Sequence, residues 1–200
     1  DHEIRIRNAN TFETVKSLKT NAALVTALDW SNDSGRLACG AESGEVELLD
    51  VATGKSIARL SGHDARVRSI RWSPDTKKVI SGGVGGVVRI WDAVTGTLSE
   101  SFDGQVWNIA DVAWSPDGQR ILALRATSYD RLYREFDSGA PIGSDLVWFP
   151  ARGGAAELII PARGYSRPHF GPDDERIYLY LSNTYSNSRN IGLISIRYDG

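Results

Sequence analysis

The chain has 200 residues, of which 41% are hydrophobic and 24% charged, and its formal net charge is −2. This composition is ordinary for a globular protein, and the lack of a strong positive charge argues against nucleic acid or an anionic membrane as a partner. No apolar run approaches the roughly 18 residues that a membrane span needs. The single cysteine, Cys39, excludes an intrachain disulfide and favours a reducing compartment, so we expect a cytoplasmic protein.

Two sequence markers recur at one fixed spacing. The dipeptide Trp-Ser occurs at residues 30, 72 and 114, and an Asn or Asp follows an apolar run at residues 8, 50 and 92, so that both sets repeat every 42 residues. A fourth copy begins at Phe170, 56 residues after Trp114. A period of this size is typical of repeat architectures, in which each repeat is one small unit of secondary structure.

Each repeat is predicted to hold four strands. In the best-defined copy, apolar runs at residues 67–72, 78–81, 87–91 and 97–102 are separated by turns rich in Gly, Pro and Asp. A four-stranded antiparallel meander repeated every ~40–45 residues is the blade of a β-propeller. We therefore predict an all-β fold, a β-propeller with about four to five such blades in the chain.

The phase of the repeat places both ends of the chain inside a blade. Residues 3–7 and 14–19 are predicted as a third and a fourth strand, and the last strand, within residues 191–200, is again a third strand. The last blade therefore lacks one strand, which residues 14–19 can supply in a closed ring of five blades. The alternative is an arc of a larger ring, closed by a second copy or by further residues. Because unpaired edge strands promote aggregation, we expect a homodimer that completes one ring.

Residues 61–96 contain four motifs of one known repeat type, namely Gly62-His63, Trp72-Ser73-Pro74-Asp75, Ser81-Gly82 and Val88-Arg89-Ile90-Trp91-Asp92. With these motifs the segment resembles a WD40 repeat. In that family a histidine, a serine, a tryptophan and an aspartate form a hydrogen-bonded brace. The resemblance implies that His63, Ser81 and Trp91 are three members of such a brace, while Val84 stands at the aspartate position and leaves it incomplete.

The preceding repeat is a degenerate copy of the same pattern. It carries Asn21 in place of the histidine, Cys39 in place of the serine, Glu42 in place of the aspartate and Leu49 in place of the tryptophan. The WD40 resemblance extends over roughly residues 1–118. We assign residues 1–107 to WD40-like blades within a single propeller of residues 1–200.

The second half of the chain has a different repeat pattern. Its units begin at Ala113-Trp114-Ser115-Pro116-Asp117-Gly118 and at Arg167-Pro168-His169-Phe170-Gly171-Pro172-Asp173, and no WD-type brace is found there. On these residues, the segment 108–200 resembles a second kind of propeller repeat, the TolB-like repeat. Such repeats occur in periplasmic TolB and as accessory propellers of prolyl-oligopeptidase-type peptidases and amidohydrolases. The chain therefore resembles a hybrid of two propeller types, natural or chimeric, and a periplasmic location is the alternative if this half reflects its origin.

No catalytic or metal-binding motif is found in the sequence. The three histidines, His2, His63 and His169, are not spaced as metal ligands with one another or with Cys39, and no Ser-x-x-Lys or Gly-x-Ser-x-Gly motif occurs. We expect His63 to be structural, Cys39 to be a small buried side chain and His169 to be partly buried on a strand. The chain is predicted not to be an enzyme and to use no metal or cofactor.

A protein-binding face is predicted where loops between second and third strands meet the segments that enter each first strand. Long insertions at residues 127–144 and 182–190 fall on this face, and aromatic and arginine side chains of the kind that favours protein binding are frequent there. The candidate binding residues are Arg66, Trp107, Asn108, Tyr129, Arg131, Tyr133, Arg134, Arg163, Tyr185 and Arg189.

Three functions are consistent with these features. The first is a non-catalytic scaffold for protein–protein interaction, binding a protein partner or a second copy of itself. The second is an accessory propeller of a TolB-like protein, an amidohydrolase or a prolyl-oligopeptidase-type protein whose catalytic domain lies outside this chain. The third is a recombined or designed propeller without a selected function. Fold alone does not decide among them.

Overall fold

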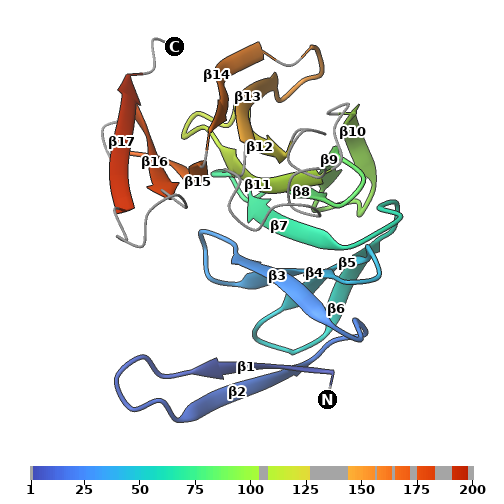
Figure 1. Cartoon of the computed structure of the whole chain (residues 1–200). Helices are drawn as coiled ribbons and strands as arrows, with labels where there is room; N and C mark the ends of the chain where they lie inside the picture. The colour runs from blue at the N-terminus through green and yellow to red at the C-terminus, as the bar shows by residue number, and fades with distance from the viewer. Residues whose placement is uncertain are drawn as a thin grey trace, which may run out of the picture.

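The computed structural model describes residues 2–103, 108–126, 144–155, 157–163, 165–171, 175–182 and 191–197. These residues form seventeen strands and no helix. The strands make five antiparallel sheets that follow one another in chain order around an arc (Figure 1). The prediction of an all-β propeller built from four-stranded antiparallel blades is therefore confirmed.

The N-terminal sheet has two strands. They are β1 (Glu3–Arg7) and β2 (Thr14–Lys19), which pair antiparallel. In the turn between them, Asn8 Oδ1 accepts hydrogen bonds from the backbone N–H groups of Asn10 and Thr11, at 2.8 and 3.1 Å. Such an Asx turn satisfies backbone donors that the hairpin leaves unpaired, and Asp50 and Asp92 accept equivalent bonds, which explains why an Asn or Asp recurs at residues 8, 50 and 92.

Three full blades follow, each a meander of four strands in which the first strand is the innermost. The first full blade comprises β3 (Val25–Trp30), β4 (Arg36–Ala41), β5 (Val46–Asp50) and β6 (Ser56–Leu60). The second comprises β7 (Val67–Trp72), β8 (Lys78–Gly83), β9 (Val87–Asp92) and β10 (Leu98–Asp103). The third comprises β11 (Asn108–Trp114), β12 (Arg120–Ala126), β13 (Ser144–Pro150) and β14 (Glu157–Arg163).

The C-terminal sheet has three strands, β15 (Tyr165–Phe170), β16 (Arg176–Ser182) and β17 (Ile191–Arg197). Within the described residues β17 pairs only with β16, and β2 pairs only with β1. The N-terminal and C-terminal sheets lie apart at the two ends of the arc (Figure 1). The chain by itself thus forms an open arc here, without the pairing of β2 and β17 that a closed ring of five blades requires.

The turn between the first and second strands of each full blade is the same small network. In the second full blade, Ser73 Oγ donates to Asp75 Oδ1 at 2.7 Å and accepts from the backbone N–H of Lys78 at 2.9 Å, while Asp75 Oδ1 accepts from the N–H of Lys77 at 3.1 Å. The hydrogen bond from Ser73 is the main cause that lowers the pKa of the Asp75 carboxyl. The same bonds recur at Ser31 with Asp33 and at Ser115 with Asp117.

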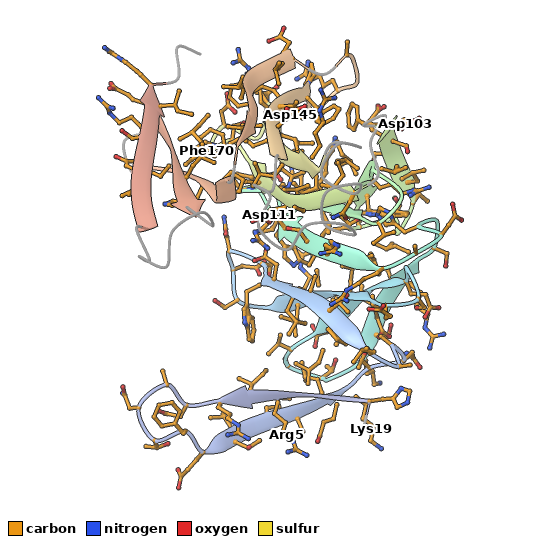
Figure 2. All side chains as sticks on the ribbon, in the orientation of Figure 1. Arg5, Lys19, Asp103, Asp111, Asp145 and Phe170 are labelled. Atoms are coloured by element: carbon orange, nitrogen blue, oxygen red, sulfur yellow. The ribbon has the colours of Figure 1, made fainter. Side chains whose placement is uncertain are left out.

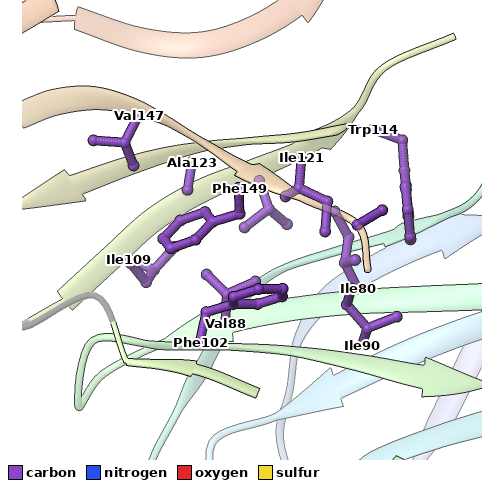
Figure 3. Packing of buried hydrophobic residues seen from close by; sticks show 12 residues of the cluster. Ile80, Val88, Ile90, Phe102, Ile109, Trp114, Ile121, Ala123, Val147 and Phe149 are labelled. Carbon is purple, nitrogen blue, oxygen red and sulfur yellow. The ribbon is translucent and has the colours of Figure 1, made fainter. Parts of the chain in front are cut away.

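Adjacent blades pack face to face through buried aliphatic and aromatic side chains. The cluster between the second and third full blades is the largest (Figure 3). It joins Ile80, Val88, Ile90 and Phe102 to Ile109, Val112, Trp114, Ile121, Ala123, Val147, Phe149 and Ala151. Burial of such side chains contributes roughly 1.5–3 kcal/mol each, so contact between blades, more than contact within one sheet, holds the arc together.

Glycine at one repeat position permits this close approach. A Cβ added at Gly40 would lie 2.5 Å from Val67 Cγ1 of the next blade, and one added at Gly82 would lie 2.7 Å from Ile109 Cγ2. Gly82 therefore serves blade packing, whereas Gly85 and Gly86, with φ of 95° and 74°, form the hairpin turn that the glycine run predicts.

Candidate functional site

The brace residues of the second full blade lie in one hydrogen-bonded group. The His63 Nε2 atom is 2.7 Å from Ser81 Oγ, and Trp91 Nε1 donates to the same oxygen at 2.8 Å. All three side chains are buried. His63 precedes the innermost strand, Ser81 lies on β8 and Trp91 on β9, so the group ties three parts of the blade together.

Arg89 takes part in this brace and was not among the residues predicted for it. Its Nη1 atom lies 3.0 Å from His63 Nδ1. Because a guanidinium group only donates, His63 Nδ1 must accept, and the neutral ring carries its proton on Nε2 and donates it to Ser81. A carboxylate at the brace position would instead accept a hydrogen bond from an Nδ1–H group. We call His63, Ser81, Arg89 and Trp91 the His63 brace.

Burial and the positive charge of Arg89 keep His63 neutral. Burial is the main cause that lowers the pKa of His63 from 6.5 to about 4; Arg89 lowers it further, and nearby Asp64 opposes both. The imidazole is therefore an uncharged structural group near neutral pH. Its two ring nitrogens are both engaged, which leaves neither free for proton transfer to a substrate.

The first full blade carries a different polar group at the same place. Glu47, the repeat equivalent of Arg89 at a spacing of 42, is buried on β5. Its carboxylate accepts hydrogen bonds from Thr20 Oγ1 at 2.7 Å, from Asn21 N at 2.9 Å and from Asn21 Nδ2 at 2.6 Å. Arg59 Nε lies 3.9 Å from it. We call Glu47, Thr20, Asn21 and Arg59 the Glu47 network.

This network corrects the sequence interpretation of the degenerate repeat. Glu42 was expected to stand in for the brace aspartate, but it pairs with Arg66 of the next blade at 3.1 Å on the surface. The acid that binds Asn21 is Glu47. The physical reason is strand direction, because residue 47 of β5 points into the blade interface while residue 42 lies in the β4–β5 turn. A comparison of residues 47 and 89 across the 42-residue repeat would have identified Glu47 and Arg89 as members of these two polar groups.

Cys39 is fully buried beside the Glu47 network. Its Sγ atom is 3.4 Å from the backbone oxygen of Glu47 and 3.9 Å from Thr20 Oγ1. Burial raises the pKa of the Cys39 thiol to about 11, so it stays protonated and is a poor nucleophile.

The predicted binding face is described in part. Val84, in the β8–β9 hairpin, joins two of its residues: its N–H donates to the backbone oxygen of Arg66 at 3.0 Å, and it forms a β-bridge with Asn108. Arg163 lies at the end of β14. The other candidates lie outside the described residues, namely Trp107, Tyr129, Arg131, Tyr133, Arg134, Tyr185 and Arg189.

A cavity of about 970 Å³ opens among the innermost strands β3, β7, β11 and β15. Its walls include Trp30, Arg68, Arg71, Asp111, His169 and Phe170. Asp111, labelled in Figure 2, accepts a hydrogen bond from Ser69 Oγ at 2.5 Å and lies 3.4 Å from Arg71 Nη2. The wall thus combines aromatic and aliphatic side chains with an ion pair, Arg71 with Asp111, that joins neighbouring blades.

His169 and Asp29 also line this cavity. His169 is exposed rather than partly buried, and its ring stacks on that of Tyr178 with 5.7 Å between centroids. Burial raises the pKa of Asp29, against the hydrogen bond that its carboxylate accepts from the backbone N–H of Trp72 at 2.7 Å. Among the described residues no group of three His, Cys, Asp or Glu side chains is placed to hold a metal ion.

The comparisons with protein families agree with the geometry of the N-terminal half. Residues 54–92 match the model of the WD domain, G-beta repeat, and residues 1–65 match that of the anaphase-promoting complex subunit 4 WD40 domain. Residues 1–92 form a WD40-type β-propeller arc. Neither match reaches the C-terminal half, so its TolB-like character stays a prediction.

The structure is similar to that of Kuenenia stuttgartiensis hydrazine synthase, with a TM-score of 0.75 and 15% sequence identity. The match covers 99% of this chain and 57% of that one, so this chain spans little more than half of the length of the hydrazine synthase chain. A likeness at this identity shows the propeller fold alone. Among curated proteins no sequence matches the chain. None of the described residues belongs to a helix long and apolar enough to cross a membrane.

Proposed function

We propose that this β-propeller chain is a non-catalytic scaffold that binds a protein partner through the face at Arg66, Val84 and Asn108. Proteins with WD40 repeats generally act as interaction scaffolds, and this class of function supports the proposal. The engaged ring nitrogens of His63 and the protonated, buried thiol of Cys39 agree with a chain that does no chemistry.

The observation that carries the proposal is the convergence of three chain segments at Val84. The entry to β7, the β8–β9 hairpin and the start of β11 meet there, so one partner can contact two blades at once. Arg66 and Glu42 form an exposed ion pair on this surface. Asn108 lies at the same junction, but its Oδ1 atom is buried and does not face a partner. The exposed Arg66 cation at such a junction favours an acidic side chain of a partner.

Selection from a phage-displayed library of random 12-residue peptides tests this proposal. Peptides selected on the wild-type chain should bind the Arg66→Glu variant at least about tenfold more weakly, the loss of roughly 1.4 kcal/mol, because the exposed cation is replaced by an anion. Lys19→Glu is the matched control, since Lys19 is an exposed cation on the distant N-terminal sheet.

Two results would contradict the proposal. Selected peptides that bind Arg66→Glu as well as the wild type would place binding elsewhere. Hydrolysis of nitrophenyl esters that His169→Ala abolishes would show that the chain is catalytic. If neither peptides nor esters engage the chain, an accessory propeller that depends on a separate catalytic domain becomes the better explanation.

A further inference from the structure

A pocket of about 450 Å³ opens between the second and third full blades. Its walls include the β7–β8 turn, the β11–β12 turn and the indole of Trp114, which is labelled in Figure 3. The pocket lies at the end of β7 opposite Arg66, because Arg66 precedes this strand and the turn follows it. Both blades have all four strands, so complete repeats enclose the pocket.

The equivalent place between the first and second full blades is occupied by an arginine of the chain itself. The Arg36 guanidinium carbon lies 4.6 Å from the centroid of the Trp72 ring, and Arg36 Nη2 donates to the backbone oxygen of Thr76 at 2.8 Å. Asp33 Oδ2 lies 3.6 Å from the same nitrogen. The cation thus has an aromatic ring, a carbonyl oxygen and a carboxylate as its partners.

The 42-residue repeat reproduces these partners at the pocket but replaces the arginine. The three partners have the equivalents Trp114, Gly118 and Asp75, and all three line the pocket. Arg36 itself corresponds to Lys78. A lysine ammonium is compact and strongly hydrated, whereas a planar guanidinium stacks on an aromatic ring. Lys78 therefore does not substitute for the arginine over the indole.

The backbone of the two turns is the same, so the carbonyl acceptor keeps its place. Thr76 and Gly118 have φ angles of 59° and 69°, and the N–H of each donates at 2.9 Å to the backbone oxygen of the turn serine. A second contact differs. Asn32 Nδ2 donates to the backbone oxygen of Pro74 at 3.0 Å. Pro74 is itself the repeat equivalent of Asn32 and has no side-chain donor for Pro116, which also lines the pocket.

Two carboxylates and two cations lie around the pocket. The hydrogen bond from the turn serine is the main cause that lowers the pKa of the carboxyl in both Asp75 and Asp117, so both are ionised near neutral pH. Lys78 and the exposed Arg152 carry the positive charges. The indole face and the carbonyl oxygens attract or accept from a cationic donor, and an anion gains nothing from either.

We infer that this pocket binds the guanidinium group of an arginine side chain in a partner peptide. The guanidinium stacks on Trp114, donates to the backbone oxygen of Gly118 and lies beside the Asp75 carboxylate. The exposed Asp117 and Gln119 border the pocket, so the side chain enters while the peptide backbone stays outside. The site is separate from the face at Arg66 and does not depend on it.

An NMR titration of the nitrogen-15-labelled chain with the blocked tripeptide Gly-Arg-Gly tests the inference. The peptide should shift the indole N–H of Trp114 and the amide of Gly118 saturably. The same peptide with lysine should bind at least about tenfold more weakly, and the peptide with the uncharged isostere citrulline should not bind.

Exchanges of arginine and lysine in the chain locate the site without a change of charge. Lys78→Arg should weaken peptide binding at least about tenfold, because the new side chain takes the place that Arg36 takes over Trp72. Lys77→Arg is the matched control, since Lys77 is exposed and outside the pocket wall, and it should bind as the wild type does. Arg36→Lys should create a second site, seen as a peptide-dependent shift of the Trp72 indole.

Other results overturn the inference. A peptide that binds Lys78→Arg as well as the wild type occupies another surface. Equal binding of the citrulline peptide would show that the charge is not recognised, and free arginine that binds as tightly as the peptide would make the ligand a small molecule. If only a Gly-Glu-Gly peptide binds, the pocket is an anion site, and if no peptide shifts Trp114, it is no binding site.

Discussion

The first and second full blades have the same strand arrangement, but side chains of opposite charge join the third strand to the segment before the innermost strand. In the second blade the cation Arg89 donates to His63, and in the first blade the anion Glu47 accepts from Thr20 and Asn21. The residue that precedes the innermost strand differs accordingly. His63 offers an acceptor nitrogen to Arg89, whereas Asn21 offers N–H donors to Glu47. The repeat thus keeps the place of a polar contact between the third strand and the segment before the innermost strand, while the chemistry of that contact varies.

Removing the tryptophan of the His63 brace should lower the free energy of unfolding the most. Trp91 is buried and donates to Ser81, so Trp91→Ala should lower the free energy of unfolding by about 3–5 kcal/mol. Trp30→Ala is the control of equal chemistry, and because Trp30 is half-exposed it should cost no more than about 1 kcal/mol. Urea unfolding measures both, and equal losses would contradict the proposed importance of the brace.

Removing the anion of the Glu47 network should have the next largest effect. Glu47→Ala leaves the Thr20 hydroxyl and two donors of Asn21 without an acceptor, which should cost about 2–4 kcal/mol. Glu45→Ala, a change of an exposed carboxylate two residues earlier, should leave the unfolding midpoint nearly unchanged. A loss no larger for Glu47 than for Glu45 would mean that the network adds nothing to stability.

The two blades should lose stability in different ranges of pH. The pKa of His63 is about 4 in the folded chain and 6.5 when unperturbed, so the unfolded chain binds more protons between these values. Stability should therefore fall by at most about 3 kcal/mol as pH drops from 6.5 to 4.

The pKa of Glu47 responds to opposing causes. Burial raises it, but the hydrogen bonds from Thr20, Ser56 and Asn21 together hold it below its usual 4.5. Its contribution is complete above pH 4.5 and is lost only below that pH. Unfolding measured from pH 7 to 3 in wild type, His63→Gln and Glu47→Gln separates the two: His63→Gln should flatten the curve above pH 4.5, and an unchanged slope there would contradict the assignment.

The smallest effect concerns the proton on His63. Nitrogen-15 NMR at pH 7 should show His63 protonated at Nε2, because Arg89 can only donate to Nδ1. Arg89→Met should raise the pKa of His63 modestly, since burial, the larger cause, remains. A spectrum with the proton on Nδ1 in the wild type would show that Arg89 does not set the tautomer.

The strand plan could be predicted from the sequence because it depends on local chemistry. Trp72-Ser73-Pro74-Asp75 combines the end of an apolar strand with a serine and an aspartate that cap the following turn. These bonds join residues five or fewer positions apart, so the same short pattern forms the same turn in every full blade. The predicted strands 3–7, 14–19 and 67–72 have the bounds of β1, β2 and β7.

The polar contacts between the third strand and the segment before the innermost strand could be identified only from the tertiary structure. Glu47 meets Asn21 across 26 residues, and Arg89 meets His63 across the same separation, so neither pair is visible in a local pattern. The family resemblance indicated an acid at Glu42 and an empty place at Val84, whereas strand direction selected residues 47 and 89. A family pattern names positions, but the direction of each side chain decides which position can reach the histidine or its replacement.

By itself the sequence determined the repeat, the number of strands in each blade and the kind of turn that joins them, because each of these depends on contacts within a few residues. Only the tertiary structure decided which equivalent side chains are covered. Leu28 and Ile70 have nearly the same chemistry and the same place in their repeats, yet one is exposed and the other buried. Burial depends on the neighbouring blade, and that neighbour has two inner strands beside Ile70 and none described beside Leu28.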